Sequence, residues 1–397
     1  MKRMRWVVVV WLALVACAAW ADDGQAARPI QVFNRLRAEY DDNIYQSDED
    51  PTSSFKVIEE LEFLVNLDLQ QTFLGVRYRP SYVWWQDREP DDTDFQHEVE
   101  FVLNQTFTPR LSLSVADSLL ISLVPELEEH GYIVRQNQDY YYNTFNATMG
   151  YLLRPATRIE GSGRYIMLQY DNEEVGENED FDLYVAGLTL RQIVTPAMTV
   201  MGNVRVEQVE YDGVDRGSDS VYAGAGLEQT FSPNMLGSLS LGYQNKEFND
   251  TELGSESAPY ADAALTFLPS PATRVTVGGG FSMFEADVYP YANQDRSQVY
   301  LSLAHDVSAR VAMYLSGAYQ VGDYSAEYSV DQGGVNDGTE ELVLVSARVT
   351  YKLNRSNWLE AGWQYQDFSS ELEWTDGTTI RVPYERNRLD VGWKTQF

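Results

Sequence analysis

Apolar and polar residues alternate with a period of two along most of the chain. Leu239, Leu241 and Tyr243, for example, occupy every second position, with serine, glycine and glutamine between and beside them. The same alternation runs through residues 274–283 and 311–320. A period of two that persists for about ten residues predicts β-strands with one apolar face and one small or polar face.

Two kinds of turn separate these strand-like runs, in a repeat of about 40 residues. Short turns, most of them with proline, lie at 108–110, 154–156, 195–197, 232–234, 270–272, 306–308 and 354–356. Longer acidic stretches lie at 87–94, 171–180, 212–219, 248–256, 286–296, 327–340 and 371–379. Each repeat therefore holds two strands, with a short turn at one end and a long acidic loop at the other.

Repeats of this size also occur in β-propellers, whose blades pack four short strands into about 40 to 45 residues. Here each repeat has two long runs with a single turn between them. A soluble propeller or sandwich would also bury its apolar face, and the small residues opposite would not fill a core. Long strands with apolar-out alternation and turns of two lengths describe a transmembrane β-barrel. Lipid cannot satisfy an open sheet edge, so the sheet must close.

The sequence therefore predicts an all-β fold, a closed antiparallel transmembrane β-barrel of about 18 strands, with both termini at the short-turn end. Sixteen strands remain the alternative if the first pair is misread. The expected strands span residues 31–40, 55–67, 70–85, 95–107, 111–123, 139–152, 158–170, 180–193, 198–211, 220–231, 235–248, 259–268, 273–286, 297–306, 310–325, 340–352, 357–371 and 383–397.

The N-terminus has the three parts of a secretory signal peptide. Basic residues come first, an apolar stretch follows at 6–15, and small residues at 19–21 suit cleavage. The apolar stretch is too short for a membrane anchor. We therefore expect a signal peptide at residues 1–21 and the barrel at residues 22–397. The residues that lead to Cys17, the single cysteine, also fit a lipoprotein cleavage box, which would leave Cys17 lipidated instead of removed.

Composition narrows the classes of partner. The chain has 397 residues, with 60 Asp and Glu against 29 Lys and Arg, and a net charge of −31. Such a chain lacks the clustered basic residues that hold nucleic acid, so nucleic acid is excluded as a default partner. Hydrophobic residues make up 44%, which excludes a disordered acidic tail, and the aromatic share of 13% favours strands. After the N-terminus, no apolar run approaches the roughly 20 residues of a membrane helix.

The last strand is the most specific local feature. Leu389, Val391, Trp393 and Phe397 lie on one face, and Phe397 ends the sequence. An alternating strand with a C-terminal Phe resembles the signal that outer-membrane barrels present to their assembly machinery. The resemblance implies the cell outer membrane as the location. It implies that machinery, outer-membrane lipid and lipopolysaccharide as partners.

A motif near the start of the barrel carries a family resemblance. Residues 38–45 read Ala-Glu-Tyr-Asp-Asp-Asn-Ile-Tyr, and residues 47–51 read Ser-Asp-Glu-Asp-Pro. Followed to the C-terminus by the rhythm of strands, short turns and acidic loops, this motif resembles the putative β-barrel porin 2 family. The resemblance implies an outer-membrane pore and leaves its substrate open. Some members of the family are associated with exopolysaccharide export.

If the apolar face meets lipid, the opposite face lines the lumen, where five strands carry charges of alternating sign. The charged residues are Glu98 and Glu100, Arg77 and Arg79, Glu60 and Glu62, Arg35 and Arg37, and, on the last strand, Arg386 and Arg388. The second and third strands place theirs at similar distances from the turn between them, so those glutamates and arginines are expected to face one another. Opposite charges on neighbouring strands contribute about 0.2–1 kcal/mol per pair. Either this charge ladder satisfies a polar interior, or it sets selectivity as charged rings do in channels.

Other interior residues are expected to be small or polar. The charged residues expected among them are Arg205, Glu207, Arg348 and Lys352. Aromatic residues near the strand ends are expected to form interfacial girdles, with an aromatic path for sugars as the alternative. They include Tyr82, Trp84, Trp85, Tyr140, Tyr141, Tyr142, Trp358, Trp363 and Trp374.

No motif for catalysis or for a cofactor is found. His97, His130 and His305 are scattered, and none has a Ser and an Asp or Asn at a recognisable spacing. His97 has Asp94 and Glu98 close in sequence, but a lone exposed histidine is far more common than a catalytic one. The acidic loop at 212–219 could hold Ca²⁺ through oxygen ligands, but it matches no regular spacing, and solvated negative charge is the preferred interpretation.

The expected function is therefore a passive channel for small hydrophilic solutes, with no enzymatic activity and no cofactor. Acidic outer loops should favour cations at the mouth by raising their local concentration. The alternative is the outer-membrane component of an exopolysaccharide export system. A structural or adhesive barrel with a plugged lumen is a third class, against which the loop lengths speak, since no loop is expected to fold far inward.

Overall fold

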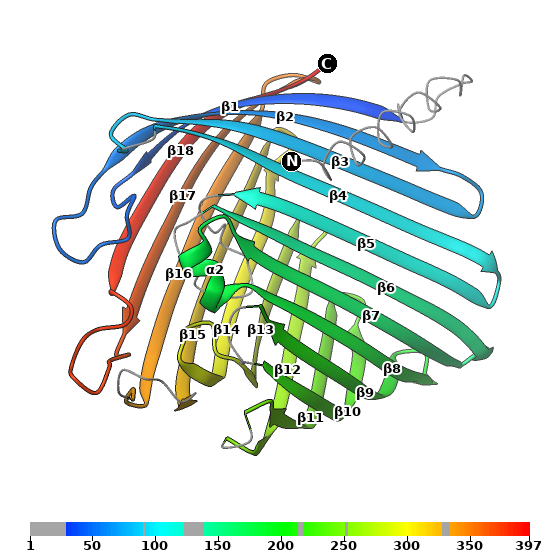
Figure 1. The fold of residues 1–397 in the computed structure, drawn as a ribbon. Helices are drawn as coiled ribbons and strands as arrows, with labels where there is room; N and C mark the ends of the chain where they lie inside the picture. The colour runs from blue at the N-terminus through cyan, green and yellow to red at the C-terminus, as the bar shows by residue number, and fades with distance from the viewer. Residues whose placement is uncertain (1–28, 90–91, 123–138, 213–216, 251–252, 328–333) are drawn as a thin grey trace, which may run out of the picture.

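The strands of the chain pair into one closed sheet (Figure 1). The computed structural model describes residues 29–89, 92–122, 139–212, 217–250, 253–327 and 334–397. Among these residues eighteen strands pair antiparallel with their sequence neighbours, and the first also pairs with the last, so the sheet has no free edge. The strands are β1 (Ile30–Asp41), β2 (Ser54–Asp68), β3 (Thr72–Trp85), β4 (Thr93–Thr108), β5 (Leu111–Ser122), β6 (Tyr140–Arg154), β7 (Thr157–Tyr170), β8 (Phe181–Thr195), β9 (Met198–Tyr211), β10 (Gly217–Ser232), β11 (Met235–Phe248), β12 (Ser255–Ser270), β13 (Thr273–Glu285), β14 (Tyr291–Ser308), β15 (Val311–Glu327), β16 (Gly338–Lys352), β17 (Asn357–Ser370) and β18 (Tyr384–Gln396).

The predicted architecture is confirmed: the fold is a closed antiparallel barrel of eighteen strands, and the alternative of sixteen is wrong. The largest differences in strand bounds are at β12 and β14, which begin at Ser255 and Tyr291, inside stretches expected to be loops. At the start of β14, Ala292 and Asn293 are both fully buried. Protein covers both faces of the strand there, so its residues do not alternate and the pattern fails.

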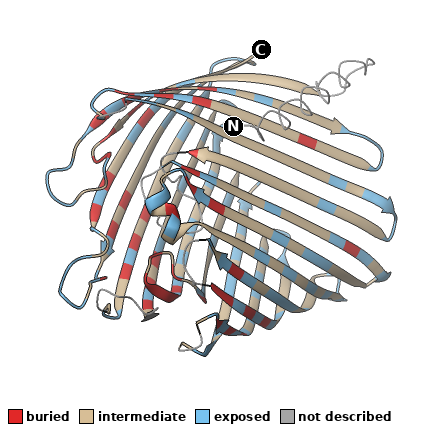
Figure 2. Ribbon diagram, viewed as in Figure 1, coloured by how far each residue is buried: buried red, intermediate tan, exposed pale blue. Residues whose placement is uncertain are grey.

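The apolar faces of the strands point outward. On β11, Leu239, Leu241 and Tyr243 are 40%, 51% and 55% exposed, whereas Gln244 and Lys246 on the other face are almost fully buried. Such a band of exposed large apolar side chains is the lipid-facing surface of a membrane barrel. Buried residues gather instead toward the strand ends that carry the long loops (Figure 2).

The seam between β1 and β18 closes the barrel. The pairing runs along β1 from Phe33 to Asp41, and the backbone N–H of Phe397 donates to the carbonyl oxygen of Val32 at 3.0 Å. Because β1 leads into a long loop and β18 follows one, the start of β1 and the end of β18 lie at the short-turn end, where the sequence predicted them.

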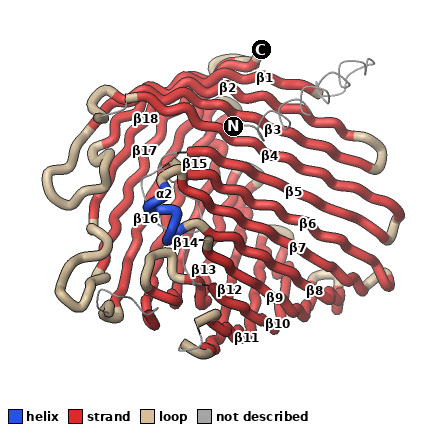
Figure 3. Tube along the Cα trace, viewed as in Figure 1, coloured by secondary structure: helices blue, strands red, loops and turns tan. Residues whose placement is uncertain are grey.

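One helix lies among the strands of the described chain (Figure 3). This helix, α2 (Glu173–Glu179), belongs to the connection between β7 and β8, where only an acidic loop was expected. The Asn172 side chain accepts a hydrogen bond from the backbone N–H of Glu174, and glutamates occupy the first turn, where negative charge is favoured. The sequence therefore carried local signals of a helix, namely an Asn at the N-cap position and glutamates in the first turn. In the described residues no helix has both the length and the apolar character needed to cross a membrane.

Two further loops pack together at the long-loop end, which we call the outer mouth. Residues 286–290 and 371–383 share a buried cluster with β14 and β15, made of Ala286, Val288, Tyr291, Tyr324 and Leu372. Residues 286 and 287 also line a hollow inside the barrel. This short loop therefore borders the barrel interior, because apolar residues at both of its ends pack inside the mouth. The expectation that no loop folds far inward stays a prediction.

Aromatic residues at the strand ends divide between the two faces. Tyr82 and Trp84 are 47% and 38% exposed on the outer surface, as a girdle requires. Trp85 and Tyr140, expected in the same girdles, are instead buried on the inner face, and the indole N–H of Trp85 donates to Asp94 at 2.7 Å. The period of two explains the division, since neighbouring residues point to opposite faces.

The N-terminal expectations concern residues outside the described part of the chain. The signal peptide at residues 1–21 and the fate of Cys17 stay predictions.

Candidate pore lining

The pleat of the strands brings the charged residues of β1 and β2 to the inner face of one wall. Arg35 of β1 lies between two acids, 3.2 Å from Glu60 of β2 and 2.6 Å from Glu360 of β17. Arg37 lies 3.9 Å from Glu39 on the same strand. Arg35 and Glu60 are directly opposite in the register, which explains their contact. The ladder thus continues from β1 in both directions around the barrel.

On β3 both arginines pair mainly with β4. Arg77 contacts Glu98 and Glu100, and Arg79 also contacts Glu98. Arg77 also lies 3.9 Å from Glu62 of β2. The register places Arg79 opposite Glu98 and Arg77 opposite Glu100. The predicted facing of β2 and β3 is therefore seen in the contact of Arg77 with Glu62, and β4 supplies closer acids to Arg77.

The arginines of β18 lie at the outer end of the seam. The guanidinium of Arg386 donates to both carboxylate oxygens of Asp41, at 2.9 and 2.6 Å, and both side chains are buried. Arg388 is opposite Asp41 in the register. These two arginines therefore neighbour the acid at the end of β1, whereas Lys394 is the residue of β18 opposite Arg35.

Several members of this charged wall were missed in the sequence. Lys56 is buried and pairs with Glu39 at 2.6 Å and with Asp41 at 3.3 Å, and Lys394 pairs with Glu62 at 2.9 Å. The four missed residues, Lys56, Glu39, Asp41 and Lys394, have the parity of the inward residues on their strands, so an extension of the period-two pattern to the strand ends would have found them. The strand register and the ion pairs place the ladder on the inner face, and its role in ion selectivity stays a prediction.

The opposite wall has a different construction, in which glycines make room for tyrosines. A Cβ added at Gly242 would lie 2.3 Å from the Tyr260 ring, and one at Gly224 would lie 2.2 Å from its hydroxyl oxygen. Tyr260 therefore lies flat across β11 and β10, and its hydroxyl donates to Asn203 of β9 at 3.3 Å. Gly278 gives the same space to the Tyr300 hydroxyl. Tyrosines thus lie along the lumen wall without filling the lumen.

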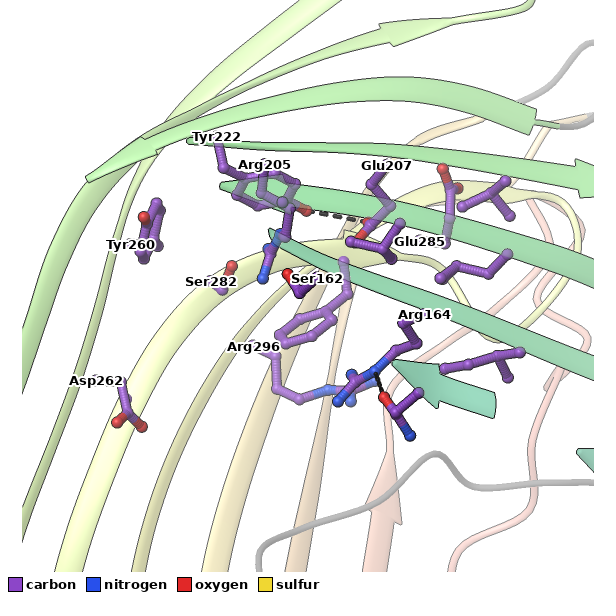
Figure 4. Close-up of a pocket in the computed structure, with 18 of the residues that line it drawn as sticks. Ser162, Arg164, Arg205, Glu207, Tyr222, Tyr260, Asp262, Ser282, Glu285 and Arg296 are labelled. Carbon is purple, nitrogen blue, oxygen red and sulfur yellow. Dashed lines mark hydrogen bonds between the residues drawn. The ribbon is translucent and has the colours of Figure 1, made fainter. Parts of the chain in front are cut away.

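A hollow of about 780 Å³ lies against this wall, which is formed by β6 to β14. Its charged lining includes Arg164, Arg205 and Arg296, and Glu207 accepts a hydrogen bond from the Tyr222 hydroxyl at 3.1 Å (Figure 4). The remaining lining mixes polar residues, among them Asn203, Ser162, Ser282 and Gln298, with apolar ones such as Ile166 and Leu183. The interior here is therefore suited to water and hydrophilic solutes.

Charges also fix the mouth loops. Arg381 lies 3.5 Å from the Asp287 carboxylate and donates to its backbone carbonyl at 2.8 Å. Burial alone would raise the pKa of Asp287, but the positive charges of Arg381 and Arg296 outweigh it and hold that pKa below its usual value. Asp287 is therefore ionised at neutral pH, and the loop at 286–290 is held by charge as well as by apolar packing.

The described residues show no catalytic arrangement around a histidine. His97 lies on the outer face, where its Nδ1 is 2.9 Å from the Tyr78 hydroxyl, while Asp94 points inward. His130 lies outside the described residues. No group of three or more His, Cys, Asp or Glu in the described chain is placed to hold a metal ion, and residues 213–216 of the loop considered for Ca²⁺ are not among them.

The residues of the expected assembly signal lie on the lipid-facing side of β18. Leu389, Val391, Trp393 and Phe397 are 53%, 62%, 48% and 71% exposed. They form one outward stripe at the seam, available to another protein before lipid covers it. Recognition by assembly machinery stays a prediction.

An apolar outside, a sheet without edges and a charged, hydrated interior together define an outer-membrane channel protein. The model of the putative β-barrel porin 2 family matches residues 34–397, so the chain belongs to that family and is located in the outer membrane. The family resemblance found in the sequence is confirmed.

Solved structures with a similar fold are also outer-membrane proteins. OccAB2 of Acinetobacter baumannii is 13% identical with a TM-score of 0.51, over 94% of this chain and 100% of that one. OccK1 (OpdK) of Pseudomonas aeruginosa is 10% identical with a TM-score of 0.50, over 93% and 99%. A structure of OpdK with vanillate gives the same values. At these identities the similarity concerns the fold alone. No curated protein sequence matches the chain.

Proposed function

We propose that the barrel is a passive channel for small hydrophilic solutes and that its outer mouth prefers cations. The hollow inside the barrel carries the proposal: its volume is about 780 Å³, and charged and hydroxyl-bearing side chains are spread over its lining. Transport then needs diffusion only, and no residue performs chemistry. The partners of this function are the solute, outer-membrane lipid and lipopolysaccharide.

The cation preference follows from the charge of the outer loops. Asp48, Glu49 and Asp50 are all exposed in the loop after β1. Negative charge around a mouth with walls of low dielectric raises the local concentration of cations. At about 0.15 M salt the effect extends only about 8 Å, so it acts on entry more than on the barrel centre.

The test of the proposal is conductance of the purified protein in planar lipid bilayers. An open channel gives steady currents, and a salt gradient gives a reversal potential of the sign for cation flow. Exchange of both Arg77 and Arg79 for Gln removes two positive charges beside Glu98 and Glu100, and should shift that potential further toward cations. An unchanged reversal potential would show that the ladder only satisfies a polar interior.

Polysaccharide export is the second candidate, and the tyrosines along the lumen wall favour it. Tyr260 and Tyr300 lie over glycines and present flat aromatic surface to the lumen, which suits sugar rings. Genes for glycosyltransferases and chain-length regulators beside the gene of this protein would support export. Their absence, with free passage of small sugars in liposome swelling, would support the diffusion channel.

A further inference from the structure

Three arginines that line the hollow inside the barrel form no ion pair within 4 Å among the described residues. Arg164 donates through Nε to the amide oxygen of Asn146 at 2.8 Å, and Arg296 donates through Nε to the amide oxygen of Gln294 at 3.0 Å. The guanidinium of Arg205 lies 3.7 Å from the Tyr222 ring centroid. These neutral partners orient the guanidinium groups and leave their charges in place.

The inward arginines on the wall formed by β1 to β4 have a different environment. Around β1 to β4 the inward arginines each lie within 4 Å of at least one carboxylate, as Arg35 and Arg77 illustrate. The chain has 60 acids against 29 basic residues, so acids were available for pairing. An arginine cannot lose its charge by deprotonation in a protein. Arg164 and Arg205 therefore keep positive charges that face the hollow, whereas the charge of Arg296 also acts on Asp287.

The same hollow offers acceptors as well as donors. Asp262 forms no ion pair among the described residues, and Glu207 has only the Tyr222 hydroxyl as a close partner there. Figure 4 shows Asp262 on the wall away from Arg164, whereas Glu207 lies near Arg205. A ligand that fits has a negative group for the arginines and hydroxyl groups, which can donate to the carboxylates.

We propose that the hollow is a binding site for small hydroxylated organic acids that pass through the channel. A carboxylate matches the planar fork of a guanidinium through two parallel hydrogen bonds. The volume of about 780 Å³ lies within the usual range for small-molecule sites. The ring of Tyr260, which is only partly buried, packs against the carbon chain or ring of the acid. The inference rests on the proposed function, because the ligand enters through the open pore.

An acidic mouth does not conflict with an acid-binding interior. The charges of the outer loops act over about 8 Å at 0.15 M salt, and the nearby Asp287 is already paired with Arg381. The loops therefore reduce the rate at which anions enter, while the arginines lengthen the time that an anion stays. Small-ion selectivity and organic-acid binding are set in different parts of the channel.

The test uses single-channel currents in planar bilayers, with gluconate as the probe and sorbitol as its uncharged counterpart. Gluconate should interrupt the current in a concentration-dependent way, and sorbitol at equal concentration should not. Exchange of Arg164 or Arg205 for Gln should weaken the gluconate effect about tenfold each, by loss of a charge-assisted hydrogen bond. Both side chains are exposed to the lumen, so the variants should fold. The control is Arg191→Gln, whose arginine pairs with Glu228, and it should retain full block.

The outcomes separate the two proposals. Steady currents that gluconate and sorbitol affect alike would overturn the acid-binding site and leave the channel standing. Absence of any current would overturn the channel, and gluconate titration of the purified protein in a calorimeter would then decide on the site. Heat of binding lost in Arg205→Gln and kept in Arg191→Gln would support the site, and no heat in the wild type would overturn it.

Discussion

The ion pair of Arg386 and Asp41 should be the main electrostatic interaction that stabilises the seam between β1 and β18. Their side chains are 2% and 0% exposed, and two hydrogen bonds join them at 2.9 and 2.6 Å. Replacement of Arg386 by Met removes the charge and both donors while it keeps much of the volume. The carboxylate of Asp41 then stays buried, with Lys56 at 3.3 Å as its remaining ion-pair partner.

The expected loss can be bounded from this geometry. Removal of one partner of a buried ion pair typically costs about 3–5 kcal/mol, because an uncompensated charge is left behind. Lys56 compensates in part, so Arg386→Met should lower the free energy of unfolding by about 3 kcal/mol. The matched control is Arg191→Met, which breaks a pair whose side chains are 29% and 45% exposed and should cost at most about 1 kcal/mol.

Urea unfolding of the folded barrel in phospholipid vesicles, followed by tryptophan fluorescence, measures both variants. The double variant Asp41→Leu with Arg386→Met removes the stranded charge and should recover most of the loss. If Arg386→Met costs no more than Arg191→Met, the argument that burial makes the seam pair strong is refuted. If the double variant is as unstable as the single one, lost packing and not the stranded charge is the cause.

Three further outcomes follow from other parts of the molecule. Deletion of Phe397, which is 71% exposed, should lower the amount of barrel assembled in cells while urea stability after refolding stays near wild type; equal losses in both would refute a signal role. Gly242→Ala should push the Tyr260 ring into the lumen and reduce single-channel conductance, whereas Gly202→Ala, with open space around the added carbon, should not. Asp287 has a pKa lowered by neighbouring arginines against the opposing effect of burial. Its contribution is therefore complete above its unfolded pKa near 3.9 and is lost as pH falls through the lower folded value. Protease sensitivity of the mouth should not change between pH 8 and 5, and should rise only in stronger acid.

Strand prediction succeeded wherever one face of the sheet meets lipid. Leu239 and Leu241 must be apolar because they contact the membrane, and the residues between them face the lumen, so the period is visible. It failed at the start of β14, where Ala292 and Asn293 are both buried under protein. The mouth contact between Asp287 and Arg381 joins residues 94 positions apart through two loops, and no local pattern records it.

The sequence predicted which charged side chains point into the lumen, but it predicted less well which of them pair with one another. The pleat fixes that Arg79 and Glu98 point inward, because successive residues take opposite faces. Which acid an arginine meets depends on the stagger between neighbouring strands, and a distance from one turn does not determine it for the whole barrel. Arg79, for example, contacts Glu98, which the register of β3 and β4 places directly opposite. The unpaired state of Arg205 likewise required the structure, since parity alone placed it beside Glu207.

Because β1 pairs with β18, no strand of the closed barrel is first or last in space. Phe397 and Val32 are joined by a backbone hydrogen bond, so a short linker could connect the two ends and new ends could be opened in a different turn. Such a circular permutant would keep every strand pair while it moves the terminal phenylalanine into the middle of the chain. The order in which the strands are presented during insertion and the stability of the completed barrel are therefore separable properties of this protein.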